Sequence, residues 1–347
     1  MKYLGTPMPN NKQQGLALIT VLFIFALVSL LAVSMQQRQV LSIAQASATF
    51  SLTQAQLLAI SAEDIAKAGL TFDGKRDDSQ NEHWDSASEL WNQPFPAQLA
   101  EAKVFITIRD LQGLFNVNSL SPNAANNKLA LSRFQRLLFE LNIDQSIAQN
   151  TKDWLTPDSQ ASSIYQNYEP AYSASGMEFS HPSELLLIEG MDKNSFLKLE
   201  PYITALPAKT PYNINTTDGI ILQAWDTKLS LDDANTVVNK TRAASCGPKD
   251  RGQNLYKTVD EFWQEDTIKN RTEDTSNPAG TWEKGDFDVK TQYFSAFIRI
   301  ELDDRDLILE SIIRRDVTQD TGFIGTVYRD FSRKVEDISR LKIINCS

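Results

Sequence analysis

The segment NNKQQGLALITVLFIFALVSLLAVSMQQR, residues 10–38, decides the architecture of this 347-residue chain. In it, twenty uncharged and mostly apolar residues, 16–35, follow Gly15 directly. A run of this length can cross a bilayer as one helix. An ordinary secretory signal has a shorter apolar core with its cleavage site behind it. The residues alone leave two readings open, an uncleaved membrane anchor or a long signal cut near Ala32 or Ser34, and neither gives Gly15 a function.

The sequence after the apolar run continues as a helix. Neither glycine nor proline occurs in residues 16–68, which number 53, and apolar residues recur at helical spacing beyond the polar stretch 36–39. We therefore predict one helix about 80 Å long that ends before Gly69. Its first half would lie in lipid and its second half would pack against a soluble domain. A cut near Ala32 would destroy this unit.

The charge of the chain excludes one class of partner. The 34 Lys and Arg residues against 44 Asp and Glu residues give a net charge of −10. Residues 1–15 carry only Lys2 and Lys12, so the remainder stands at −10 − 2 = −12. Binding to a phosphate backbone needs a basic surface, so we predict no nucleic-acid partner.

The soluble part combines strands with a helical segment. VFITIRD (104–110) and AFIRIEL (296–302) alternate apolar and polar residues as half-buried antiparallel strands do, and GFIGTVYRDF (322–331) is a further strand candidate. Residues 120–206 are mostly helical in pattern. We therefore predict an α+β fold, in which a long N-terminal helix packs on an antiparallel sheet and a large all-helical domain is inserted between strands.

A short motif occurs twice. FNVNSL (115–120) and YNINTTDG (212–219) share the pattern Asn-x-Asn-Ser/Thr. Asparagine at turns usually satisfies neighbouring backbone groups, and the hydroxyl residues can cap a following helix. The alternative interpretation is a pair of polar binding loops.

The N-terminal segment resembles the class III leader of the type IV pilin and pseudopilin superfamily. The resemblance implies that a prepilin peptidase cuts between Gly15 and Leu16 and methylates the new N-terminal Leu16. Most members have a glutamate five residues into the mature chain, where this sequence has Thr20. In filaments of the superfamily that glutamate pairs with the N-terminal ammonium of the subunit ahead, because an unpaired carboxylate in lipid is costly. A subunit that lacks the glutamate needs no subunit ahead of it, as expected at a filament tip.

The rest of the chain resembles the minor pseudopilin of the K type from bacterial type II secretion systems. DLQGLFNVNSL (110–120), PSELLLIEGMDKNSFLKLEPYITALP (182–207) and the two Asn motifs carry this resemblance, which extends from Gly15 to about Leu302. It implies a place at the tip of the periplasmic pseudopilus, where the protein starts or caps assembly for the export of folded proteins. It also implies a single pass through the bacterial inner membrane, with the C-terminal domain in the periplasm.

The resemblance also implies partners. These are other minor pseudopilins of the I, J and H types, the prepilin peptidase, the inner-membrane assembly platform and, as a further candidate, secreted substrates.

Two alternatives to the pseudopilin function stay open. One is a minor pilin of a type IV pilus or competence filament. The other is a single-pass membrane-anchored periplasmic protein, either an enzyme or a solute-binding protein.

These readings give a domain scheme. We predict a cleaved leader (1–15), a transmembrane half-helix (16–35), the rest of the helix with the first part of the pilin-like domain (36–119), the inserted helical domain (120–206) and the remainder of the pilin-like domain (207–347). We expect the apolar face of the helix that includes Val40, Ile43, Leu57 and Ile60 to contact neighbouring helices.

Catalytic chemistry is not predicted. The only histidines are His83 and His181, and neither has the spacing of a zinc site or a catalytic triad. We expect no required cofactor. Calcium is a candidate because relatives of the K type bind it, and hard oxygen ligands would be needed. The acidic residues considered as calcium ligands are Asp153, Asp158 and Glu169 in one segment and Glu283, Asp286 and Asp288 in another. The ligands themselves stay unassigned.

The chain has two cysteines, Cys246 and Cys346. An even count in an exported protein predicts one disulfide between them. In a cytosolic chain the same residues would be two free thiols.

Overall fold

The computed structural model describes residues 12–80, 84–93, 95–99, 101–243, 255–272, 282–303, 305–317 and 322–341. Two compact units divide the chain, Met1–Gln56 and Leu57–Ser347. The helix α1 (Lys12–Gln80) supplies all the described residues of the first unit and begins the second.

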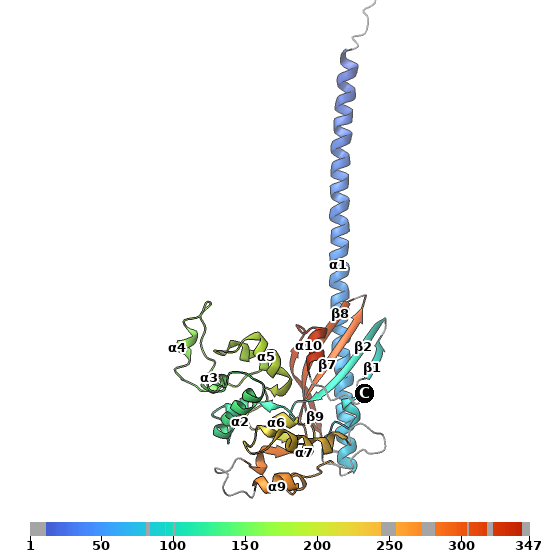
Figure 1. Ribbon diagram of the computed structural model, residues 1–347. Helices are drawn as coiled ribbons and strands as arrows, with labels where there is room; N and C mark the ends of the chain where they lie inside the picture. The colour runs from blue at the N-terminus through green and yellow to red at the C-terminus, as the bar shows by residue number, and fades with distance from the viewer. Residues whose placement is uncertain are drawn as a thin grey trace, which may run out of the picture. The chain divides into compact units, whose positions relative to one another are not determined.

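Helix α1 is continuous, as predicted, but it is longer than the sequence pattern indicated (Figure 1). It passes through Gly69 and Gly74 and ends at Gln80. A glycine inside a helix costs only about 1 kcal/mol relative to alanine. The burial of Leu70 and Asp73 directly after Gly69 holds this part of the helix in place. Among the described residues, α1 is the one helix long and apolar enough to cross a membrane, and its apolar window is fully exposed.

The predicted antiparallel strands are confirmed, and they form one five-stranded sheet with the order β1-β2-β7-β8-β9. In register, Ile106 lies opposite Ile298, and Ile298 lies opposite Leu309, so apolar residues line up across three central strands. The strands are β1 (Phe95–Leu99), β2 (Ala102–Asp110), β7 (Tyr293–Leu302), β8 (Arg305–Val317) and β9 (Gly322–Asp330). The sequence pattern did not indicate β1, a short edge strand that contains a proline.

Strands β2 and β7 are neighbours in the sheet, although residues 111–292 separate them in the sequence. Figure 1 shows α2, α3, α4 and α5 to one side of β2, β7 and β8. Further helices, α6 to α9, follow beyond Leu206. The elements of this segment are η2 (Val117–Leu120), α2 (Asn127–Glu140), α3 (Ser146–Leu155), α4 (Ser162–Tyr165), η3 (Pro182–Leu187), α5 (Lys193–Leu199), η4 (Glu200–Tyr202), α6 (Gly219–Gln223), α7 (Leu231–Ala243), α8 (Val259–Trp263), α9 (Asp266–Thr272) and η5 (Lys284–Asp286).

Short strands and terminal elements complete the fold. Two parallel bridges join β3 (Phe115–Asn116) to β4 (Ile203–Thr204) and β5 (Tyr212–Asn213) to β6 (Phe287–Asp288). The remaining elements are η1 (Leu90–Asn92) and α10 (Val335–Arg340).

The core of the helical segment forms on the amphipathic helix α2. Its residues Phe134, Leu137 and Leu138 are completely buried, and Phe134 stacks on Phe115 with ring centroids 5.2 Å apart. Helix α2 and strand β3 thus share one apolar cluster, and Tyr293 of β7 and Ile312 of β8 also belong to it, so the cluster joins the helical segment to the sheet.

The repeated Asn motif acts as a backbone clamp at both positions. The Asn118 side chain accepts a hydrogen bond from the backbone N–H of Phe179 at 2.8 Å and donates to the carbonyl of the same residue at 2.9 Å. Asn215 makes the same two contacts with Tyr256, at 3.1 and 2.9 Å. Both asparagines are buried. The motif therefore satisfies buried backbone groups of distant segments, as the first of the two interpretations predicts.

Candidate functional site

The residues predicted to direct maturation lie at the start of α1. Gly15 is part of the helix and Leu16 is exposed. The hydroxyl of Thr20 donates to the carbonyl of Ala17 at 2.9 Å within the same helix. Its polar group is thus satisfied locally and carries no charge, so this position needs no partner in an apolar environment. Cleavage between Gly15 and Leu16 and methylation of Leu16 stay predictions.

The four residues predicted to contact neighbouring helices differ in exposure. Val40 and Ile43 in the first unit are exposed, as is Leu57 at the start of the second unit. Ile60 is half-buried. Three of the four side chains are therefore free to meet another protein, whereas Ile60 already packs partly within its own unit.

An apolar groove that sequence reasoning missed lies between α1 and the strands β1 and β2. Its volume is about 520 Å³. Two large side chains on its walls are exposed, Phe72 to 66% and Phe95 to 56%. Phe72 follows Leu57 and Ile65 at helical spacing, and this signal in the sequence could have revealed the surface. The lining residues are Ile65, Ala66, Ala68, Gly69, Phe72, Asp73, Trp91, Gln93, Phe95, Ile106 and Ile108.

The opposite side of α1 is fixed to the sheet by small side chains and one buried carboxylate. Ala59 and Ala62 are buried and allow close approach of the helix to the strands. The carboxylate of Glu63, exposed to 0%, accepts hydrogen bonds from Ser311, Thr326 and Arg329. These donors come from β8 and β9, so Glu63 ties α1 to the far edge of the sheet.

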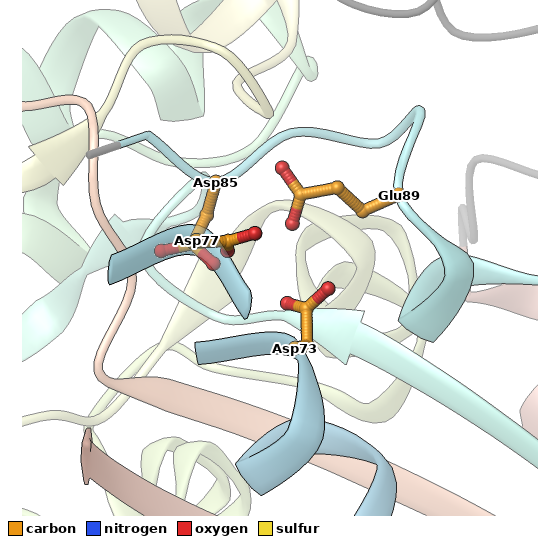
Figure 2. Close-up of side chains that lie close together, drawn as sticks. All are labelled: Asp73, Asp77, Asp85 and Glu89. Carbon is orange, nitrogen blue, oxygen red and sulfur yellow. The ribbon is translucent and has the colours of Figure 1, made fainter. Parts of the chain in front are cut away.

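A second charged cluster lies at the end of α1. Figure 2 shows Asp73 and Asp77 of the helix directed toward Asp85 and Glu89 of the following loop, and one oxygen of each lies within 4.8 Å of the others. Arg315 of β8 contacts this group, with its Nη1 3.0 Å from Asp73 Oδ2 and its Nη2 against Asp85. The cluster therefore joins the helix, the loop and the sheet.

The charge of this cluster is balanced in part by bound protons. Two guanidinium groups face four carboxylates, because Arg76 also contacts Asp73 and Asp77, at 3.0 and 3.1 Å. Burial, followed by the charge of Asp73, raises the pKa of Asp77 to about 7. Burial, followed by the charge of Asp85, raises the pKa of Glu89 well above its usual value. A carboxyl group with a raised pKa keeps its proton to a higher pH, and this lowers the repulsion within the cluster.

The two segments considered for calcium do not form such a group among the described residues. Asp153 accepts a hydrogen bond from Gln149, and Asp286 pairs with Arg133 at 2.8 Å. A guanidinium thus already pairs with Asp286, and calcium binding by either segment stays a prediction. The cysteines Cys246 and Cys346 lie outside the described residues.

Comparisons with known proteins agree on one family. Residues 113–208 match the family model described as type II secretion system protein K. The chain is 27% identical to type II secretion system protein K of Pseudomonas aeruginosa over 318 residues, which cover 87% of this chain and 89% of the relative. It is 28% identical to the protein K of Klebsiella pneumoniae, over 68% of this chain and 77% of the relative.

A solved structure shares the fold. A chain of the crystal structure of the GspK-GspI-GspJ complex from the enterotoxigenic Escherichia coli type 2 secretion system matches with a TM-score of 0.66 and 22% identity, over 84% of this chain and 100% of that chain. Together with the sequence matches, this likeness confirms the resemblance drawn from the sequence. The chain is thus similar to the protein K of bacterial type II secretion systems.

Proposed function

We propose that this protein is the minor pseudopilin at the tip of the periplasmic pseudopilus, where it starts or caps assembly. The observation that carries this proposal is the pairing of a protein K domain with a helix whose apolar residues stay exposed well beyond the membrane segment. The role is structural rather than catalytic. The mature N-terminus would begin at Leu16, with the helix anchored in the inner membrane and the second unit in the periplasm.

Two features support the tip position. Thr20 replaces the charged residue that would pair with a subunit ahead. The segment between β2 and β7 adds a set of helices beside the sheet (Figure 1). Subunits inside a filament pack in close succession, so such a lobe would collide with the next subunit. Only the distal end leaves room for it.

The partners we propose are the other minor pseudopilins of the I, J and H types. The solved structural neighbour is described as a GspK-GspI-GspJ complex, which supports the I and J types, and the H type rests on the resemblance drawn from the sequence. The contact surface in the second unit would be the apolar groove, which includes Phe72, together with the exposed Leu57 on the same helix. Apolar side chains exposed at the centre of an interface dominate its binding energy. The prepilin peptidase and the inner-membrane platform are further proposed partners during maturation and assembly.

The test is co-purification of the full-length chain with the other minor pseudopilins in detergent. Phe72→Glu places a charge in the groove and should lower recovery of the partners by at least about tenfold. Phe139→Glu is the matched control, because Phe139 on α2 is a phenylalanine of similar exposure, 62% against 66% for Phe72. Equal recovery with both variants would refute the proposed contact surface. Detection of the chain at regular intervals along the filament shaft would refute the tip position.

A further inference from the structure

The acidic cluster at the end of α1 and the apolar groove beside it share residues. The cluster consists of Asp73, Asp77, Asp85 and Glu89 (Figure 2). Asp73 also lines the groove. Trp91 of η1 lines the groove as well, and its indole Nε1 donates a hydrogen bond to Glu89 Oε2 at 2.6 Å. A change in the charge of the cluster therefore acts directly on the wall of the groove.

A second series of contacts joins the cluster to Trp91 through the sheet. Arg315 of β8 pairs with Asp73 and Asp85. Its guanidinium lies over the ring of Phe294, 4.7 Å from the ring centroid. The rings of Phe294 and Trp91 meet edge to face, with centroids 5.1 Å apart. Trp91 is buried, so its hydrogen bond to the cluster and its contact with Phe294 both help to fix this wall.

Bound protons decide the charge of the cluster. Its four carboxyl groups face two guanidinium groups, those of Arg76 on α1 and Arg315 on β8. The buried carboxyl group of Asp110 on β2 lies close enough to Asp85 to sense its charge and adds a further acidic group. Within the four, two bound protons would balance the two guanidinium groups. Each proton lost beyond that point adds a negative charge without a partner.

Asp77 is the member of the cluster that changes its charge near neutral pH. Burial, followed by the charge of Asp73, raises the pKa of Asp77 to about 7. One oxygen of Asp77 lies within 4.8 Å of an oxygen of every other member. A new charge on Asp77 therefore repels the carboxylates around it. Asp73 and Glu89, the two members that adjoin the groove, are among the groups affected.

We propose that proton binding by the acidic cluster controls the apolar groove on α1. With a proton on Asp77, the wall at Trp91 is held in place and the groove accepts the apolar surface of a partner. When this proton is lost, repulsion loosens the loop that carries Asp85 and Glu89, and the partner binds less tightly. The inference rests on the groove as the proposed contact surface, and it makes that contact depend on pH.

The first test follows Trp91 in the absence of any partner. The full-length chain in detergent is labelled with 5-fluorotryptophan, and Trp91→Phe identifies the fluorine NMR signal of Trp91. We expect this signal to shift as the pH rises, with a midpoint at about 7. Asp77→Asn places an amide where the protonated carboxyl group lies, so the shift should be lost in this variant.

Two controls separate Asp77 from other groups that titrate. Asp64→Asn changes a carboxyl group on the same helix that is exposed to 66%, and it should leave the shift of the Trp91 signal unchanged. His83→Gln removes a side chain that lies outside the described residues and that ordinarily titrates in the same pH range. It should leave the shift unchanged as well.

The second test measures co-purification of the I-type and J-type pseudopilins with the full-length chain at about pH 6 and at about pH 8. Recovery with the wild-type chain should fall about fivefold or more between the two conditions, as in typical coupling between two sites. With Asp77→Asn, recovery should be the same at both.

Several results would overturn the inference. They are a Trp91 signal that does not shift with pH, one that shifts equally in Asp77→Asn, and one that no longer shifts in His83→Gln. Recovery that does not depend on pH, while the Trp91 signal shifts, would overturn it too. If the Trp91 signal shifts as expected but neither pseudopilin is recovered at either pH, control of the groove wall is supported and the proposed contact surface is refuted.

Discussion

Replacing Glu63 by alanine tests how α1 is held to the sheet. The Glu63 carboxylate accepts hydrogen bonds from Arg329 Nε at 2.7 Å, Ser311 Oγ at 2.7 Å and Thr326 Oγ1 at 2.5 Å. Lys67 Nζ lies 3.1 Å away. Burial raises the pKa of Glu63, but the hydrogen bonds from Arg329, Thr326 and Ser311 outweigh it and bring the pKa to about 2.

The expected loss of stability for Glu63→Ala is about 2–3 kcal/mol. Removing one member of a buried charge pair costs about 3–5 kcal/mol because the other member is left unpaired. The Arg329 side chain is exposed to 44% and regains water, which places the loss below that range. Since folding lowers the pKa of Glu63, its contribution is fully present above pH 4.5 and is lost as the pH falls toward 2. The difference between wild type and Glu63→Ala should shrink over the same interval.

The assay is urea unfolding of the full-length chain in detergent, followed by tryptophan fluorescence. All six tryptophans lie between residues 84 and 282, so the signal reports on the second unit. Asp64→Ala is the control, because Asp64 also contacts Lys67, at 2.7 Å, but is exposed to 66%. It should cost less than about 0.5 kcal/mol. Equal losses for the two variants, or a Glu63→Ala effect that does not change with pH, would refute this account of the carboxylate.

Three further predictions concern processing, oxidation and pH. In cells with an active prepilin peptidase, intact mass should show a chain that begins at methylated Leu16. Gly15→Leu should block the cut because the peptidase must approach the backbone closely. A mature chain that begins at another residue would contradict the maturation scheme. Non-reducing peptide mapping should find Cys246 linked to Cys346. This disulfide closes a loop of about 100 residues and would add up to about 4.7 kcal/mol to the free energy of unfolding. Two freely alkylated thiols in the exported protein would contradict the prediction. Because folding raises the pKa of Asp77 to about 7, the folded state binds more protons than the unfolded state, so stability should fall as the pH rises from 4 to 7. Asp77→Asn should flatten this dependence, and an unchanged slope would show that other groups cause it.

The elements with a strong local signal could be predicted from the sequence. The strands β2 and β7 follow from alternation, the segment of β9 is a further strand candidate, and α1 follows from its unbroken apolar spacing. The end of α1 could not be placed, because contacts made by Leu70 and Asp73 carry the helix past its glycines. Strand β1 has no alternating pattern of its own and exists because β2 offers an edge for pairing.

The charged clusters and the groove on α1 depend on residues that the sequence keeps far apart. Arg329 meets Glu63 across 266 positions, and Arg315 meets Asp73 across 242. An isolated acidic residue in a helix reads as a solvent-exposed position, so neither carboxylate stands out before the sheet is assembled.

The first Asn motif also explains how a helical segment can interrupt a sheet without separating its strands. A segment inserted between β2 and the strand beside it must leave and return at nearly the same place. Asn116 Oδ1 accepts a hydrogen bond from the backbone N–H of Leu206 at 3.0 Å, and Asn118 Nδ2 donates to the carbonyl of the same residue at 3.0 Å. Beside them, Phe115 and Asn116 pair with residues 203 and 204 in the bridge β3–β4. The two ends of the segment 120–206 are therefore joined by side chains as well as by backbone. This arrangement lets the segment carry its own apolar core while the sheet keeps its order, which is what a pilin-like body needs if it is to bear a lobe at the end of a filament.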